Sequence, residues 1–292
     1  MASLTDRPPL EGQPEICRFQ GHDGITLRAS AWGPADAQPV VLAHGGGQTR
    51  NAWGRTGAKL GRAGYRAYAL DLRGHGESDW APEGRYAVVD VAPDAIAVSA
   101  QLGRRPVWVG ASFGGLIGLV AGGTVPTPFE ALVLVDIAPR IELEGVRRIF
   151  EFMTAYPDGF ASVEEAADAV AQYLPHRPRP SDLTGLAKNL RLRPDGRYVW
   201  HWDPKLLAQT REEFDREVLH FYDAARALRL PTLVVRGKKS DVLSVEGAEE
   251  LVALVEGAQY VDVTDAHHMV AGDDNDAFTD AVVAFLQALP SD

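Results

Sequence analysis

The chain has almost no cysteine and no excess of basic residues. A single cysteine, Cys17, stands among 292 residues, so an internal disulfide and a cysteine metal cluster are both excluded. There are 29 lysine and arginine residues against 40 aspartate and glutamate residues, which gives a net charge of −11. Since nucleic acids are normally bound by a basic face, this balance argues against a nucleic-acid partner. The histidines show no metal-ligand spacing, so we expect no metal ion and no cofactor.

Long apolar runs are missing as well. No run is long enough to cross a bilayer. The opening residues Met1 to Pro14 are rich in proline and polar residues and lack the charged start and apolar stretch of a secretory signal. The sequence therefore predicts a protein without a membrane partner and, by default, a cytoplasmic location. The 46% hydrophobic and 24% charged content is that of an ordinary globular protein.

What the chain does have is an alternation of apolar, β-branched runs with helical patterns, which is typical of a mostly parallel sheet covered on both faces. The predicted strands are Ile25–Trp32, Val40–Ala43, Ala67–Leu72, Val107–Val109, Leu132–Ile137, Thr232–Arg236 and Gln259–Val263. The predicted helices between or after them are Ala52–Ala63, Val91–Leu102, Gly115–Ala121, Val245–Val255 and Asp276–Leu289. The fold class is therefore α/β.

One interval interrupts this alternation. Between residues 139 and 222 there are helical patterns at Val146–Tyr156, Val163–Tyr173 and Leu183–Leu190, followed by a short extended piece at Arg197–Trp202. A stretch this long is not a plain loop inside a compact domain. We interpret residues 139–222 as a helical cap inserted into a core made of residues 15–138 and 223–290.

The candidate nucleophile is Ser112, in the sequence Gly110-Ala111-Ser112-Phe113-Gly114. The apolar residues before it predict a buried strand and those after it a helix, which is the context that a G-x-S-x-G motif requires. Glycines on either side allow the close packing that such a turn needs, while the serine takes a strained backbone conformation. Because the bare motif also arises by chance, its surroundings must decide.

Two backbone N–H groups are candidates for an oxyanion hole. Phe113 lies at the N-terminus of the helix after Ser112, where unpaired donors and the helix dipole favour negative charge. Gly46 lies in His44-Gly45-Gly46-Gly47, directly after a predicted strand. Together they would direct two fixed dipoles at one oxygen. The alternative for the second segment is a glycine-rich turn that only reverses the chain.

A serine nucleophile needs a histidine base and a carboxylate that orients it. Of the adjacent His267 and His268, which follow the last predicted strand, we favour His268 as the base and regard His267 as a structural neighbour. Asp241 comes a few residues after the predicted strand Thr232–Arg236, and Asp136 lies at the end of the predicted strand Leu132–Ile137. We favour Asp241 because it keeps the chain order Ser, Asp, His. Asp136 is the competing acid, and a turn or helix-capping role is the structural alternative for Asp241.

Aromatic residues of the expected cap form an apolar roof in this interpretation, together with one residue near the glycine-rich segment. Such residues pack a core more often than they contact a ligand. The candidate substrate-binding residues are Trp53, Phe150, Phe152, Met153, Trp200 and Trp202. His201 is expected in the cap lining, and His75 in a structural role.

These motifs together resemble the α/β-hydrolase superfamily over nearly the whole chain. The resemblance rests on His44 to Gly47 with a later Trp53, on Asp71-Leu72-Arg73-Gly74-His75-Gly76-Glu77-Ser78, and on Ser112, Asp241 and His268. It implies a mostly parallel eight-stranded sheet with a cap inserted after the sixth strand.

Within the superfamily, the Asp71 to Ser78 loop and the helical cap look like the epoxide-hydrolase and dehalogenase branch. Those enzymes use an aspartate where this chain has Ser112. A serine suits acyl transfer, so the chain looks more like capped serine esterases, enol-lactonases, carbon–carbon bond hydrolases and cofactor-free perhydrolases or haloperoxidases.

The resulting hypothesis is a serine hydrolase that cleaves an ester or lactone of a small hydrophobic substrate through an acyl-enzyme intermediate. A carbon–carbon bond hydrolase or a perhydrolase with the same residues remains the nearest alternative. A non-catalytic small-molecule receptor on the same fold is an alternative from a different class.

Overall fold

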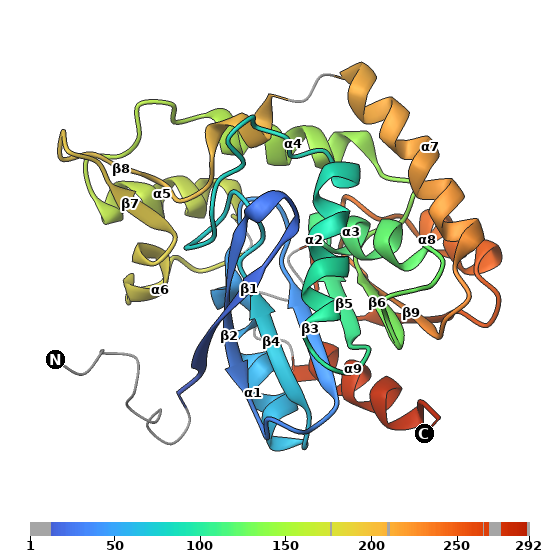
Figure 1. Cartoon of the computed structure of the whole chain (residues 1–292). Helices are drawn as coiled ribbons and strands as arrows, with labels where there is room; N and C mark the ends of the chain where they lie inside the picture. The colour runs from blue at the N-terminus through green and yellow to red at the C-terminus, as the bar shows by residue number, and fades with distance from the viewer. Residues whose placement is uncertain (1–12, 176, 209–210, 265, 269–275, 291–292) are drawn as a thin grey trace, which may run out of the picture.

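The computed structural model describes residues 13–175, 177–208, 211–264, 266–268 and 276–290. Within them, a sheet of eight strands runs in the order β1-β2-β4-β3-β5-β6-β9-β10 (Figure 1). Strand β2 pairs antiparallel with β1 and with β4, and the pairs from β4 to β10 are parallel. The strands of this sheet are β1 (Glu15–Gln20), β2 (Thr26–Trp32), β3 (Pro39–Ala43), β4 (Arg66–Leu70), β5 (Val107–Ala111), β6 (Ala131–Val135), β9 (Thr232–Gly237) and β10 (Gln259–Val263).

The described helices lie on both faces of the sheet and in the segment between β6 and β9. They are α1 (Gly54–Arg62), α2 (Val88–Ala100), α3 (Phe113–Gly122), α4 (Leu143–Thr154), α5 (Val163–Tyr173), α6 (Thr184–Ala187), α7 (Arg211–Ala227), α8 (Val245–Leu254) and α9 (Asp276–Ala288). Short 3-10 turns lie at His22–Gly24, Arg50–Trp53 and Pro204–Leu207. Helices α1 and α9 pack on one face through Leu60, Phe278 and Val282, whereas α2, α3, α7 and α8 pack on the other.

The alternating side chains of the strands explain these layers. On the central strands, Val41, Trp108 and Leu134 face the α2 and α3 side, and their neighbours Val40 and Val109 face the α1 and α9 side. Strands buried on both faces read as continuous apolar runs, which is why the sequence located them. The predicted α/β class with a mostly parallel eight-stranded sheet is confirmed.

The residues between β6 and β9 form a separate layer of short elements, here called the inserted segment (residues 139–222). It contains α4, α5, α6 and a small antiparallel pair, β7 (Leu190–Leu192) and β8 (Tyr198–Trp200). Its own apolar cluster centres on Phe160, Ala166 and Ala169. Helix α7 crosses residue 222, the predicted end of the segment, and continues along α3 to Ala227 (Figure 1).

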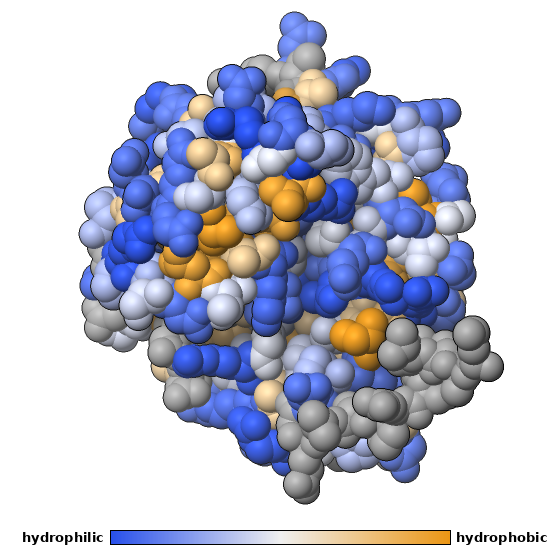
Figure 2. Space-filling model, turned by 90° about the vertical axis from the view of Figure 1, so that its left-hand side faces the viewer, coloured by the Kyte–Doolittle hydropathy of each residue, from blue (hydrophilic) through white to orange (hydrophobic). Residues whose placement is uncertain are grey.

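Seen from the side of α5 and α6, the molecule is mostly hydrophilic, and apolar side chains gather in separate patches on this face (Figure 2). Most of the large apolar side chains of the inserted segment contribute instead to its own cluster or to the cavity described below. The segment is therefore amphipathic, with its apolar side turned to the carboxyl ends of the parallel strands.

Candidate active site

Ser112 lies on a sharp turn between β5 and α3. Its backbone has φ 47° and ψ −115°, a conformation that costs free energy for a residue with a side chain. The neighbouring glycines explain how the turn closes. A Cβ on Gly110 would lie 2.2 Å from the Gly114 carbonyl oxygen, and one on Gly114 would lie 2.6 Å from the Ala43 carbonyl oxygen. Only glycine fits at either position. The strand, turn and helix that the motif predicts are present as β5, the turn at Ser112 and α3.

Asp136 extends the strand beside the one that carries Ser112. Ala111 pairs with Val135 in the sheet, and the Ser112 N–H donates to the Val135 carbonyl at 3.1 Å. Asp136 also has a positive φ, 53°, and its side chain is fully buried. Both strands therefore end in a left-handed residue at the same edge of the sheet, and the two side chains belong to one site.

His268 is bonded to Asp136. The distance from His268 Nδ1 to Asp136 Oδ2 is 2.7 Å. The same carboxylate accepts hydrogen bonds from the Gly237 N–H, at 2.8 Å to Oδ1, and from the Ser240 hydroxyl. A buried carboxylate that is satisfied in this way holds one nitrogen of the imidazole in a fixed orientation and leaves Nε2 for proton transfer.

The expectation that Asp241 would orient His268 is wrong, because the structure gives this place to Asp136. Asp241 Oδ2 pairs with Arg148 Nη1 of α4 at 2.6 Å, and the Asp241 side chain is 44% exposed. It ties the inserted segment to the loop after β9. Its neighbour Ser240, which sequence reasoning did not single out, is the residue of this loop whose hydroxyl reaches Asp136.

The glycine-rich segment after β3, here called the oxyanion loop (residues 44–48), contains the Gly46 N–H, which donates to no acceptor among the described residues. The Gly45 N–H donates to Gln48 Oε1 at 3.0 Å, and the Gly47 N–H donates to His75 Nε2 at 3.1 Å. Hydrogen bonds among the described residues leave the N–H groups of Gly46 and Phe113 without an acceptor. The loop is joined to the nucleophile turn by the Gly114 N–H, which donates to the His44 carbonyl at 3.1 Å.

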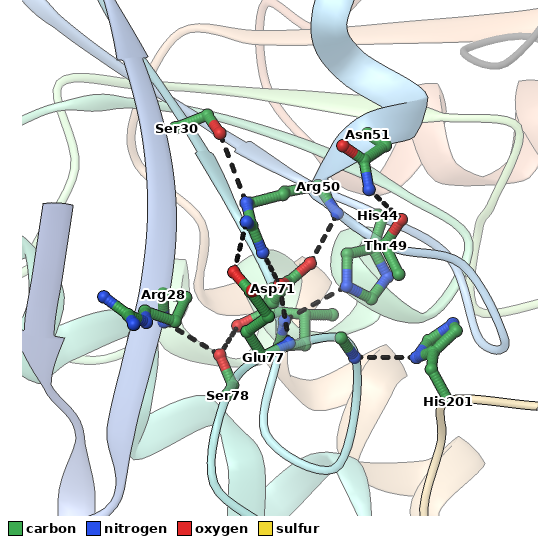
Figure 3. Close-up of polar contacts among 12 residues, drawn as sticks. Arg28, Ser30, His44, Thr49, Arg50, Asn51, Asp71, Glu77, Ser78 and His201 are labelled. Atoms are coloured by element: carbon green, nitrogen blue, oxygen red, sulfur yellow. Dashed lines mark hydrogen bonds and ion pairs between the residues drawn. The ribbon is translucent and has the colours of Figure 1, made fainter. Parts of the chain in front are cut away.

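Three buried histidines lie in or against this loop. Burial lowers the pKa values of His44, His75 and His201 to about 3, so all three are neutral near pH 7. His44 Nδ1 donates to the Gly45 carbonyl at 2.8 Å, because its Nε2 accepts the Leu72 N–H at 3.1 Å (Figure 3). The predicted structural role of His75 agrees with its place here.

A buried carboxylate fixes the far end of the oxyanion loop. Asp71 accepts hydrogen bonds from the Arg50 N–H at 2.7 Å and the Glu77 N–H at 2.9 Å, and it pairs with the Arg50 guanidinium (Figure 3). Arg50 also reaches Ser30 at 3.2 Å. The loop thus leaves β3 and enters the turn at Arg50–Trp53 with both ends held.

A cavity of about 760 Å³ lies between the inserted segment and the carboxyl ends of the strands. Ser112, Phe113, Gly46 and His268 line it, so the candidate nucleophile, the two candidate oxyanion donors and the candidate base open into one space. From the inserted segment the lining includes Phe150, Phe152, Met153, Trp200 and Trp202, all of which the sequence analysis singled out.

The expectation that Trp53 contacts the substrate is wrong. Its side chain is completely buried and packs against Phe278 of α9, with ring centroids 5.9 Å apart. Its neighbours Ala52 and Gly54 line the cavity instead. Trp53 is a core residue because the last turn before α1 directs it to the α1 and α9 side of the sheet.

Two further findings concern the described part of the chain. No group of three or more histidine, cysteine, aspartate or glutamate side chains within it could hold a metal ion. None of the helices that the structure describes combines the length and the apolar character needed to cross a membrane.

Comparison with known proteins places this geometry in a family. Residues 38–274 match the model of the α/β hydrolase fold. The chain is 27% identical over 250 residues to a 3-hydroxybutyrate-oligomer hydrolase of Cupriavidus necator, covering 81% of this chain and 85% of that protein. It is 30% identical over 244 residues to an esterase of Mycobacterium tuberculosis, covering 82% of this chain and 77% of that protein.

Comparison with solved structures shows the same fold. The crystal structure of E-2-(acetamidomethylene)succinate hydrolase superposes with a TM-score of 0.82 at 23% identity, over 94% of this chain and 99% of that chain; at this identity the likeness shows the fold alone. The sequence relatives are hydrolases, one of them an esterase, which supports hydrolase activity here. Since the family model covers most of the sequence, the chain belongs to the α/β-hydrolase fold family.

Proposed function

We propose that the protein hydrolyses carboxylic esters or lactones through an acyl-enzyme intermediate. Ser112 Oγ attacks the substrate carbonyl carbon, and His268 Nε2 takes the hydroxyl proton and returns it to the departing alcohol oxygen. The N–H groups of Gly46 and Phe113 stabilise the oxyanion of the tetrahedral intermediate. Water then attacks the acyl-enzyme with His268 as the base, which releases the acid and restores Ser112.

The observation that carries the proposal is the hydrogen bond between His268 and the buried Asp136, on the strand next to that of Ser112. A neutral imidazole oriented by a carboxylate is what a serine needs to become nucleophilic at neutral pH. Ser112 and His268 line the same cavity, so a substrate held in this cavity is exposed to both side chains.

The substrate that fits the cavity is hydrophobic, with the inserted segment acting as a cap over it. Met153 Cε and Trp202 Cζ3 come within 3.2 and 3.3 Å of the position that a Cβ on Gly47 would take, so both lie directly against the oxyanion loop. A group attached to the reacting carbonyl therefore meets Met153 and the stacked pair Trp200 and Trp202, whose ring centroids are 5.0 Å apart.

The test is the hydrolysis of p-nitrophenyl esters of increasing acyl length by the protein and by Ser112→Ala. We expect the variant to lose at least about 10³-fold in kcat while its thermal unfolding stays unchanged, because the Ser112 hydroxyl makes no hydrogen bond to the other residues that the structure describes. Unchanged turnover in the variant would refute the proposal.

A panel of lactones, vinylogous diketones and peroxide-dependent halogenation substrates separates the ester and lactone reaction from the reactions that other enzymes perform with a serine, histidine and aspartate. Tight binding of an ester without a burst of product would point to a receptor instead.

A further inference from the structure

The turn formed by Gly74, His75 and Gly76, here called the His75 turn, lies between the oxyanion loop and the inserted segment. It is held closely in place. A Cβ on Gly74 would lie 2.6 Å from the Tyr86 ring, and one on Gly76 would lie 2.2 Å from the Asp71 carboxylate. Both glycines have positive φ, 76° and 55°. The His75 turn therefore has little freedom to move independently of its neighbours.

On one side, the His75 turn holds the oxyanion loop. His75 Nδ1 lies 3.0 Å from the Arg73 carbonyl oxygen, to which it donates, so Nε2 carries the lone pair that accepts the Gly47 N–H at 3.1 Å. Gly47 directly follows the oxyanion donor Gly46. Any shift of His75 is passed to the peptide that orients the Gly46 N–H.

On the other side, residues 191–203 of the inserted segment bond to the backbone of the same turn. The Gly76 N–H donates to His201 Nδ1 at 2.7 Å (Figure 3). Arg191 Nη2 donates to the Gly76 carbonyl at 2.7 Å, and the Asp203 N–H donates to the Gly74 carbonyl at 2.8 Å. The imidazole of His201 is buried, and its ring centroid lies 5.9 Å from that of His75.

A second set of hydrogen bonds joins the inserted segment to the residues next to the oxyanion loop. Thr49 Oγ1, just beyond the oxyanion loop, donates to Asn189 Oδ1 at 2.9 Å, and the His201 N–H donates to the Asn189 carbonyl at 3.1 Å. His201 thus takes part in both of these hydrogen-bonded connections, through its side chain in the first and its backbone N–H in the second. Among these contacts it is the buried side chain that bonds directly to the His75 turn.

We propose that His201 is a positioning residue for the oxyanion hole, acting through the His75 turn on Gly47 and Gly46. The inference rests on the proposed hydrolase function. It means that the inserted segment does more than bound the substrate: its β8 end completes the geometry of a site whose reacting groups all come from the core. A neutral imidazole is required, since only an unprotonated Nδ1 accepts the Gly76 N–H.

The first experiment compares His201→Leu with His201→Asn, in which Oδ1 takes the place of Nδ1. Loss of one oxyanion donor costs about 10²–10³ in kcat, so a displaced donor in His201→Leu should cost about 10-fold, with KM changed by less than about 3-fold. Phenylboronic acid, which forms a tetrahedral adduct with an active serine, should bind about 10-fold more weakly. His201→Asn should recover most of both losses.

A matched pair of surface variants tests the same turn without touching the buried imidazole. Arg191 lies within β7 and Arg193 directly after it, and both are exposed, but Arg191 bonds to Gly76 whereas Arg193 pairs with Asp195. Arg191→Met should lower kcat and boronic acid affinity by about 2- to 3-fold. Arg193→Met should leave both unchanged.

The inference is overturned if His201→Leu loses thermal stability but keeps wild-type kcat and boronic acid affinity, because the contact is then merely structural. If His201→Leu does not yield folded protein, the Arg191 and Arg193 pair decides, and equal behaviour of the two variants rejects the inference. Inactivity of Ser112→Ala together with full activity of His201→Leu rejects this inference alone. An active Ser112→Ala rejects the proposed function.

Discussion

Asp136 and Asp241 differ in the one property that matters for an imidazole, which is direct contact. Asp136 is buried and bonded to His268 at 2.7 Å, whereas Asp241 lies at the surface on Arg148. We expect Asp136→Asn to lower kcat by about 10³–10⁴, because the amide no longer stabilises the imidazolium or fixes its tautomer. Asp241→Asn removes an exposed ion pair worth at most about 1 kcal/mol and should leave kcat within about 2-fold.

Steady-state kinetics on a short p-nitrophenyl ester distinguishes the two variants. The reverse ranking, with Asp241→Asn inactive and Asp136→Asn active, would contradict the site described here. Thermal unfolding of Asp136→Asn serves as the control, because the single amide oxygen can replace only one of the two carboxylate oxygens that accept from the Gly237 N–H and the Ser240 hydroxyl.

The choice between these carboxylates shows what sequence order leaves open. Both residues lie between Ser112 and His268 along the chain, so the order Ser, Asp, His fits either. What separates them is the pairing of β5 with β6, which puts Ser112 and Asp136 on adjacent strand ends. Pairing depends on contacts distant in sequence, whereas the turn around Ser112 is local, and its glycines and flanking apolar runs were sufficient to predict it.

At the scale of elements, Gly114 is where the nucleophile turn and the oxyanion loop touch. A Cβ there would come within 2.6 Å of the Ala43 oxygen and 2.7 Å of the His44 oxygen, and backbone atoms cannot give way cheaply. We expect Gly114→Ala to push the two segments apart, to lower kcat by at least about 10-fold and to destabilise the fold by about 1–3 kcal/mol.

Gly122→Ala on the same helix is the matched control for this substitution. Its Cβ would meet the Leu228 side chain at 3.1 Å and the Phe129 ring at 3.5 Å, and both are side chains rather than backbone. Urea unfolding together with kcat should therefore show a small change in the control. If Gly114→Ala behaved like Gly122→Ala, the close contact of Gly114 with the Ala43 and His44 carbonyl oxygens would not matter for activity.

The elements that were not predicted share a physical reason. Strand β1 is an edge strand in which Phe19 alone is buried, and helix α7 is so polar that only a narrow face, including Phe221 and Ala225, packs on α3. Their sequences lack a long apolar pattern. Leu190, predicted as the end of a helix, begins β7 because it pairs with Trp200. Buried central strands carry their own signal, whereas edge elements are decided by their partners.

The whole molecule places three neutral imidazoles in one buried cluster. His44 and His75 have ring centroids 4.9 Å apart, and His75 and His201 have theirs 5.9 Å apart. Burial lowers the pKa of each to about 3, against about 6.5 in an unfolded chain. Protonation of one of these imidazoles is unfavourable because the charge is buried and because the ring nitrogens accept hydrogen bonds from backbone N–H groups. Acid should therefore weaken both the fold and the hydrogen bonds that hold the oxyanion loop.

The sign of the resulting pH dependence follows from the direction of these shifts. Between pH 6.5 and 3 the unfolded chain binds more protons than the folded one, so the free energy of unfolding falls as the pH decreases through this window and is unaffected by these groups above it. At pH 5, one imidazole has lowered the free energy of unfolding by roughly 2 kcal/mol.

Urea unfolding at pH 7.5, 6 and 5 should show this decline in the free energy of unfolding. His75→Gln should reduce the slope of the decline by about one third, since glutamine keeps an acceptor near Gly47 but does not titrate. His220→Gln, at an exposed position of α7, is the control. An equal slope in His75→Gln and the unmodified protein would show that the buried cluster is not the origin of the acid sensitivity.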